Sequence, residues 1–148
     1  MVKATVLAMF CASGLSAADF TLTIGNPIAA NMPRMKSAGL AVRLENCADL
    51  SKAGIVGVAE GLVGDVRQSI PVELVAGTTP GIYVVPHAWP VDGTWLVNLK
   101  ATCGEAKAGA LVPFRGTSFW REGIQVFARF ATAAEVAGAL KDRTGGTK

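Results

Sequence analysis

Few side chains in this sequence are of types that could bind a metal ion. His87 is the only histidine, and Met32 and Met35 place two thioethers close together. Thioether sulfur is a soft ligand that selects cuprous copper, and His87 could complete a three-ligand site if the two loops meet. In the alternative, which we favour, the methionines fill gaps against a sheet and His87 is a surface loop residue.

Residues for catalysis are fewer still. A serine hydrolase needs a base beside its nucleophile, and Ser118 lies outside the Gly-x-Ser-x-Gly sequence of a nucleophile elbow. The chain has no Cys-x-x-Cys pair, and no two of its 11 acidic residues are spaced to suggest a shared cleft. We therefore expect a protein that is not an enzyme and that carries no cofactor.

Two groups of residues are candidates for ligand binding. His87, Trp89 and Asp92 lie in a predicted loop, and such loops carry recognition at the ends of β-sandwiches. Trp120 and Arg121 form a second group, of residue types that are enriched at interfaces. In the alternatives, Trp89 covers the end of the core, and Trp120 packs within an ordinary strand.

The first 18 residues have the three-part pattern of a secretory signal peptide. A lysine at position 3 precedes an uncharged, mostly apolar run over residues 4–15, and Ser16-Ala17-Ala18 suits a signal peptidase. The run is too short to span a bilayer, which needs about 20 residues. We expect an exported chain, periplasmic or secreted, that begins at Asp19 and has no membrane span after cleavage.

Cleavage would remove Cys11 and leave Cys47 and Cys103. An even pair of cysteines in an exported chain predicts one disulfide, with two free buried thiols as the alternative. Strict alternation along the preceding strand would turn Cys47 to the solvent face. For Cys47 to form the disulfide, that strand must end near Asn46 or contain a bulge. Lipidation of Cys11 is disfavoured, because a large residue, Phe10, precedes it.

Composition excludes two further classes of protein. Hydrophobic residues make up 51% of the 148 residues and charged residues 17%, which excludes a disordered chain and suits a single domain. The 14 lysines and arginines are scattered along the chain, so no basic patch for nucleic acid is present in the sequence.

Short stretches in which apolar and polar residues alternate, separated by turn residues, predict an all-β fold. The predicted strands are residues 20–24, 40–45, 55–63, 66–74, 82–85, 94–103, 108–114 and 119–130. Pro71 cannot donate to a ladder, so its strand is expected at a sheet edge, where pairing with another protein stays open. Thr132 and Glu135 match a capping box, which predicts one C-terminal helix.

The segment from Pro80 to Cys103 carries a family resemblance. A proline-glycine pair, a strand with Tyr83, a proline-bounded loop and the sequence Asp92-Gly93-Thr94-Trp95 resemble a hairpin of small exported immunoglobulin-like domains, including YtkA-like and copper-resistance-type periplasmic families. The similarity covers about residues 39–114 and implies an antiparallel immunoglobulin-like sandwich of seven to eight strands. Copper-binding relatives use His- and Met-rich sites, from which this chain departs.

These observations predict three segments and one main function. We expect a signal peptide over 1–18, an immunoglobulin-like β-sandwich over 19–131, and a helix and tail over 132–148. The predicted function is an exported, non-catalytic binding or accessory module for an unknown protein or small ligand. A periplasmic copper carrier using Met32, Met35 and His87 is the alternative, and a small hydrolase ranks third.

Overall fold

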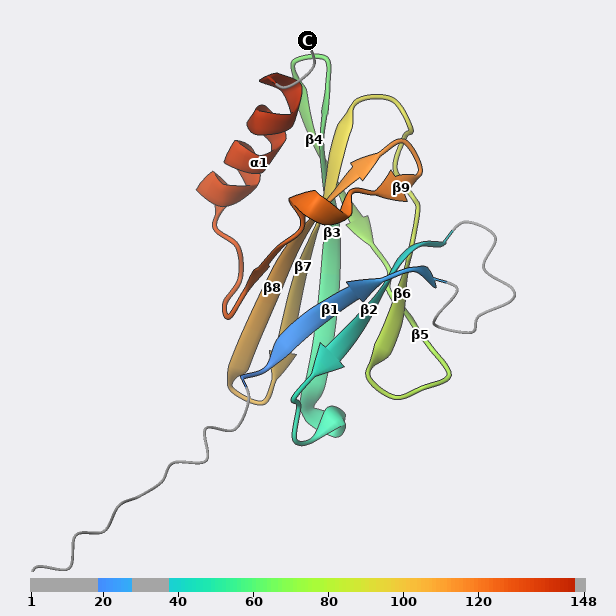
Figure 1. The fold of residues 1–148 in the computed structure, drawn as a ribbon, viewed down its shortest axis with the longest axis vertical. Helices are drawn as coiled ribbons and strands as arrows, with labels where there is room; N and C mark the ends of the chain where they lie inside the picture. The colour runs from blue at the N-terminus through green and yellow to red at the C-terminus, as the bar shows by residue number, and fades with distance from the viewer. Residues whose placement is uncertain (1–18, 28–37, 146–148) are drawn as a thin grey trace, which may run out of the picture.

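The computed structural model describes residues 19–27 and 38–145. Two antiparallel β-sheets pack together, and a C-terminal helix lies against one of them (Figure 1). The predicted all-β sandwich with a short C-terminal helix is therefore confirmed. The expected signal peptide, Met32 and Met35 lie outside the described residues.

The two sheets differ in size. The four-stranded sheet has the order β1-β2-β6-β5, and the larger sheet has the order β10-β8-β7-β3-β4, with β9 paired to β8. The smaller sheet comprises β1 (Thr21–Gly25), β2 (Ala38–Glu45), β5 (Val75–Ala76) and β6 (Ile82–Pro86). The larger sheet comprises β3 (Ala53–Val63), β4 (Val66–Val72), β7 (Thr94–Cys103), β8 (Ala106–Arg115), β9 (Ser118–Phe119) and β10 (Gln125–Phe127).

Three helical elements complete the described chain: the 3-10 helices η2 (Leu50–Lys52) and η3 (Arg121–Gly123), and α1 (Ala133–Gly145). Among the described residues, seven strands have five residues or more, in line with the seven to eight predicted. The other three strands, β5, β9 and β10, have two or three residues each.

The core between the sheets follows the alternation of β7. Trp95, Val97, Leu99 and Ala101 all lie in it, as the sequence predicts. Gly61 of β3 pairs with Trp95, and a Cβ atom at Gly61 would lie 2.4 Å from the indole ring. The indole therefore packs directly on the backbone of β3, which only glycine allows at that position.

Helix α1 covers part of the outer face of the larger sheet. Leu96 alternates with the core residues of β7 and so faces away from the core, yet it is fully buried. Val136 and Leu140 of α1 form a second apolar cluster with Leu96 and Leu111. This packing gives the short helix most of its stability, because isolated helices of this length are marginal in water.

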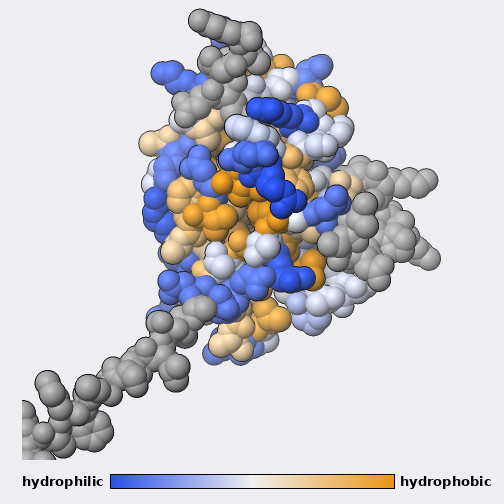
Figure 2. Space-filling model, viewed as in Figure 1, coloured by the Kyte–Doolittle hydropathy of each residue, from blue (hydrophilic) through white to orange (hydrophobic). Residues whose placement is uncertain are grey.

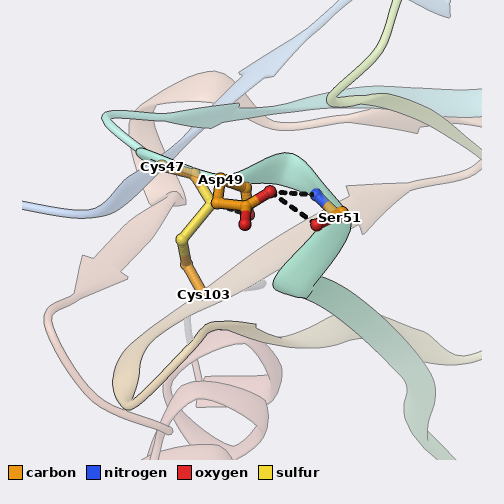
Figure 3. The surroundings of a disulfide bond; sticks show 4 residues. All are labelled: Cys47, Asp49, Ser51 and Cys103. Atoms are coloured by element: carbon orange, nitrogen blue, oxygen red, sulfur yellow. Dashed lines mark hydrogen bonds between the residues drawn. A yellow bond between two sulfur atoms is a disulfide. The ribbon is translucent and has the colours of Figure 1, made fainter.

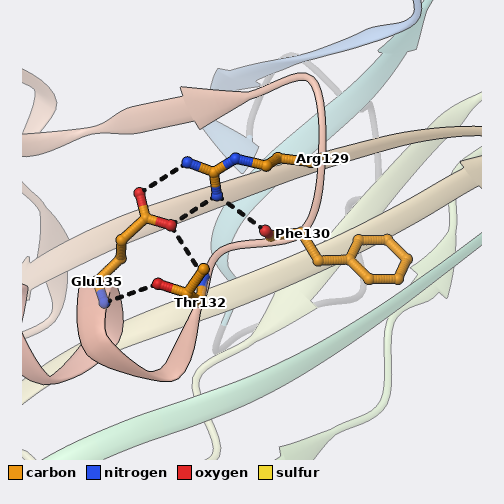
Figure 4. A network of polar contacts seen from close by, with 4 residues as sticks. All are labelled: Arg129, Phe130, Thr132 and Glu135. Carbon is orange, nitrogen blue, oxygen red and sulfur yellow. Dashed lines mark hydrogen bonds and ion pairs between the residues drawn. The ribbon is translucent and has the colours of Figure 1, made fainter.

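The helix begins at the predicted capping box (Figure 4). The Glu135 N–H donates to Thr132 Oγ1 at 3.1 Å, and the Thr132 N–H donates to Glu135 Oε1 at 3.0 Å. The Arg129 guanidinium adds a forked ion pair, with N–O distances of 2.6 and 3.1 Å. The hydrogen bond from Arg129, helped by the one from the Thr132 backbone, lowers the pKa of Glu135 to about 2.

A disulfide between Cys47 and Cys103 ties the end of β2 to the end of β7, and so joins the two sheets (Figure 3). The two Cα atoms lie 5.9 Å apart. Asn46, with φ of +63°, follows the last residue of β2 and redirects the chain, which resolves the alternation conflict at Cys47. The bridge spans a sequence separation of 56, for which the chain-entropy model gives about 4 kcal/mol.

Strand β4 lies at one edge of the larger sheet, where Pro71 predicts it. The two-residue turn Gly64-Asp65 joins it to β3, with Gly64 at a φ of +63°, as the first position of a type II′ turn requires. Residue pairs then follow one another without interruption from Val63–Val66 to Gly57–Val72.

Two sequence predictions about connections are wrong. The strands on either side of residues 87–93 do not form a hairpin, because β6 belongs to the smaller sheet and β7 to the larger, so the loop crosses between sheets. Residues 119–130 are not one strand: β9, η3 and β10 divide them. The chain leaves the ladder after Phe119, since the Gly123 N–H donates to the Trp120 carbonyl and closes a turn.

Two glycine substitutions test the packing around α1. Gly138 lies inside the helix, and a Cβ atom there would meet nothing within 4 Å. We expect Gly138→Ala to raise the free energy of unfolding by about 0.5–1 kcal/mol, because glycine loses more chain entropy on folding. Urea unfolding of the variant measures this change.

Gly109→Ala is the matched control. A Cβ atom at Gly109 would lie 2.5 Å from the Arg129 carbonyl oxygen, where the chain crosses β8 on its way to α1. This substitution should destabilise the protein, because the backbone of β8 and that of residues 129–131 would have to move apart. Equal effects of the two substitutions would contradict the described path of residues 129–131.

Candidate binding site

Trp89 lies in the loop between β6 and β7 and is part of the hydrophobic core. Trp89 is only 5% exposed, and its ring centroid lies 4.2 Å from that of His87 and 4.9 Å from that of Phe114. The contact with Phe114 is edge-on, a favourable arrangement for two aromatic rings. This position matches the alternative in which Trp89 covers the end of the core.

His87 is partly buried beside Trp89, and its Nε2 atom has no hydrogen-bond partner among the described residues. Burial lowers the pKa of His87 below its ordinary value of 6.5, because desolvation disfavours the charged ring. In the described part of the chain, no group of three or more His, Cys, Asp and Glu side chains is placed to hold a metal ion. Of the three residues of the alternative copper site, His87 is the one that lies in the described part of the chain.

Asp92, the third predicted residue of this loop, is exposed. Its backbone carbonyl accepts a hydrogen bond of 2.8 Å from the Trp95 indole N–H. The next residue, Gly93, has φ of +93° and approaches the backbone of Leu62 so closely that a Cβ atom would lie 2.5 Å from the Leu62 oxygen. The carbonyl of Asp92 therefore helps to fix the crossing loop.

The second predicted group, Trp120 and Arg121, lies near the same end of the sandwich but on the outer side of the larger sheet. The Phe114 ring centroid lies 5.9 Å from that of His87 and 6.5 Å from that of Phe119, the residue before Trp120. Trp120 is held by a hydrogen bond from its backbone N–H to the Pro113 carbonyl. Its ring also packs on Gly123, where a Cβ atom would lie 2.4 Å away.

Trp120 forms one wall of a pocket of about 240 Å³ between α1 and the outer face of the larger sheet. The pocket is lined by Leu96, Leu111, Pro113, Trp120, Gly123, Gln125 and Ala139. The lining is mostly apolar, and Gln125 supplies its one hydrogen-bonding side chain besides the indole. Figure 2 shows hydrophobic residues gathered near the centre of the face that carries η3 and β10, within a hydrophilic surround.

Two arginines lie beside this pocket without a carboxylate partner among the described residues. The Arg115 guanidinium lies 4.2 Å from the centroid of the Trp120 ring, and that of Arg121 lies 5.7 Å from the Phe119 ring. The other arginines with described side chains each pair with a glutamate: Arg43 with Glu45, Arg67 with Glu60, and Arg129 with Glu135. Arg115 and Arg121 are thus the arginines with described side chains that form no ion pair, and Arg115 lies over the Trp120 ring.

Sequence reasoning found Trp120 and Arg121 by residue type but missed Arg115 and the floor of the pocket. Leu96 was a usable signal, since it is the one large apolar residue on the otherwise polar face of its strand. Such a residue indicates that another element covers that face. Arg115 follows Pro113 by two residues, so alternation places it on that same outer face.

Comparison with known proteins adds no further constraint. No protein-family model matches the chain, and neither the curated proteins nor the solved structures contain a significant match. Within the described ranges, no helix combines the length and apolar character that a membrane crossing requires.

The lowered pKa of His87 makes stability depend on pH. Near pH 6.5 the unfolded chain begins to bind a proton at this ring, whereas the folded chain does so only at lower pH. The contribution of neutral His87 to the free energy of unfolding is therefore complete above pH 6.5 and is lost as the pH falls through the folded pKa. We expect the urea midpoint to fall over this range in the wild type, and to fall less in His87→Gln.

An NMR titration of the His87 ring measures the folded pKa directly. The expected midpoint lies below 6.5. A midpoint at or above this value would contradict the burial of the imidazole, as would equal pH dependence of unfolding in the wild type and His87→Gln.

Proposed function

We propose that this protein is an exported, non-catalytic binding module whose ligand occupies the pocket between α1 and the larger sheet. The observation that carries the proposal is the Trp120-walled pocket itself. Its floor, Leu96 and Leu111, faces away from the core between the two sheets. The pocket therefore lies outside the packing that holds the two sheets together.

The residues around the pocket favour binding over catalysis. Its lining contains no acidic, basic, thiol or hydroxyl side chain, and general acid–base or nucleophilic chemistry needs such groups. What the site offers is apolar contact, the Gln125 amide and the two neighbouring guanidinium groups. Mostly apolar walls with a few polar groups are typical of small-molecule sites.

The export part of the proposal is supported by two features. The N-terminal sequence has the charge and length pattern of a signal peptide. The Cys47–Cys103 bridge joins the two sheets, and such disulfides persist in oxidising compartments such as the periplasm.

A neutral probe tests binding in the pocket. We expect 3-phenylpropionamide to shift the NMR signal of the Trp120 indole N–H in a saturable manner, with assignment by Trp120→Phe. Ala139→Leu should weaken this binding at least about tenfold, because the added side chain fills space that the probe needs.

Ala137→Leu is the matched control, since Ala137 lies on the exposed side of the same helix. It should leave the binding of the amide unchanged. Equal weakening by both substitutions would locate the probe elsewhere, and no shift of the Trp120 signal at any probe concentration would refute the pocket as a ligand site.

Expression of residues 1–148 in a Gram-negative bacterium tests export. We expect a periplasmic product that begins at Asp19 and carries the disulfide, detected by intact mass with and without a reductant. A charge in the apolar run, as in Leu7→Arg, should keep the full-length chain in the cytoplasm with reduced cysteines. An uncleaved cytoplasmic wild type would contradict the proposed export.

A further inference from the structure

We infer that the pocket binds a small organic carboxylate, with the apolar body of the ligand against Trp120 and its carboxylate on Arg115. This inference deepens the proposed function and rests on it. It concerns the chemical class of the ligand, which neither the fold nor the comparisons specify.

The position of Arg115 makes it the natural anchor for an anion at this pocket. Arg115 lies on the outer face of β8, two residues beyond Pro113, which lines the pocket. Its guanidinium lies 4.2 Å from the centroid of the Trp120 ring, which forms a wall of the same pocket. Arg115 does not itself line the pocket, so its guanidinium would meet the part of a ligand that extends past the edge of the indole.

The chemistry of a stacked guanidinium suits a carboxylate. Stacking on an aromatic face uses the flat side of the group and leaves its N–H donors free at the edge. Those donors form a fork that matches the two oxygens of a carboxylate, so the resulting hydrogen bonds are short and charge-assisted. Arg115 makes no ion pair with any described residue, in contrast to Arg43, Arg67 and Arg129.

The local charges also favour an anion. Arg121 contributes a second guanidinium at the Phe119 ring, 5.7 Å from its centroid. No carboxylate lines the pocket, and Glu122, the nearest acid along η3, forms no ion pair with a described arginine. A negatively charged group at this site would therefore meet guanidinium groups that pair with no described carboxylate.

The size of the pocket limits the apolar body of the ligand. Its volume is about 240 Å³. An engineered cavity of about 150 Å³ in another protein holds one benzene molecule, so a phenyl ring or a short acyl chain fits here and a long acyl chain does not. Leu96, Leu111 and Pro113 would contact that body, and the Gln125 amide offers a further hydrogen bond.

A pair of probes of nearly the same shape, one anionic and one neutral, tests the inference. We expect 3-phenylpropionate at pH 7 to bind the wild type about tenfold more tightly than 3-phenylpropionamide, with Kd values from the Trp120 indole N–H shift; tenfold corresponds to about 1.4 kcal/mol. Arg115→Gln should abolish this preference, because it removes the charge that distinguishes the two probes while the residue itself is exposed on β8.

Arg43→Gln is the matched control, because it removes the same charge from an exposed site on β2 in the other sheet. It should keep the preference for the carboxylate. Equal affinities of the two probes for the wild type would overturn the inference and leave the pocket as a ligand site. If both arginine variants lost the preference equally, the preference would reflect the net charge of the protein and not Arg115, which would overturn the inference. If neither probe bound, the proposed function would be overturned as well.

Discussion

Strand β7 is buried on both of its faces, and the rest of the molecule depends on covering them. On one face, Trp95 and its alternating neighbours need the second sheet; on the other face, Leu96 needs α1. If either face were left in water, the fold would lose roughly 25 cal/mol of hydrophobic stabilisation for each Å² of exposed apolar surface. The second sheet covers the Trp95 face of β7 completely. A single helix is narrower than a sheet, so α1 covers only part of the opposite face. The pocket is the space that α1 leaves beside Leu96 and Leu111.

The shape of that pocket therefore depends on how the chain enters α1. Gly109 allows the segment after β10 to lie directly on β8, because any side chain there would meet the Arg129 carbonyl. Arg129 then pairs with Glu135, whose carboxylate also accepts the Thr132 N–H, so the first helical turn is fixed from both sides. The proposed selection of small ligands requires walls held in this way, since a helix free to shift would not exclude larger ones.

The alternation of apolar residues was enough to predict the sandwich and the core face of β7, because both depend on a period of two along one strand. The edge position of β4 was predicted from Pro71, which has no N–H to donate to a neighbouring strand. The capping box at Thr132 was likewise readable, since its partners lie three residues apart. Alternation does not say which sheet a strand joins, so the crossing between β6 and β7 was missed. The pocket was missed because Leu96, Leu111 and Ala139 meet only through tertiary packing, although Trp120 and Arg121 stood out by type.

The edge position of Pro71 bears on how this molecule behaves at high concentration. The two-residue turn after Val63 makes Val63–Val66 a hydrogen-bonded pair, and pairs along an antiparallel ladder alternate. Arg67, Ser69 and Pro71 therefore direct their backbone groups outward, and the nitrogen of Pro71 has no hydrogen to donate. An incoming strand from a second molecule would lose a ladder bond at Pro71. Pairing of two copies of the chain through the β4 edge is therefore disfavoured.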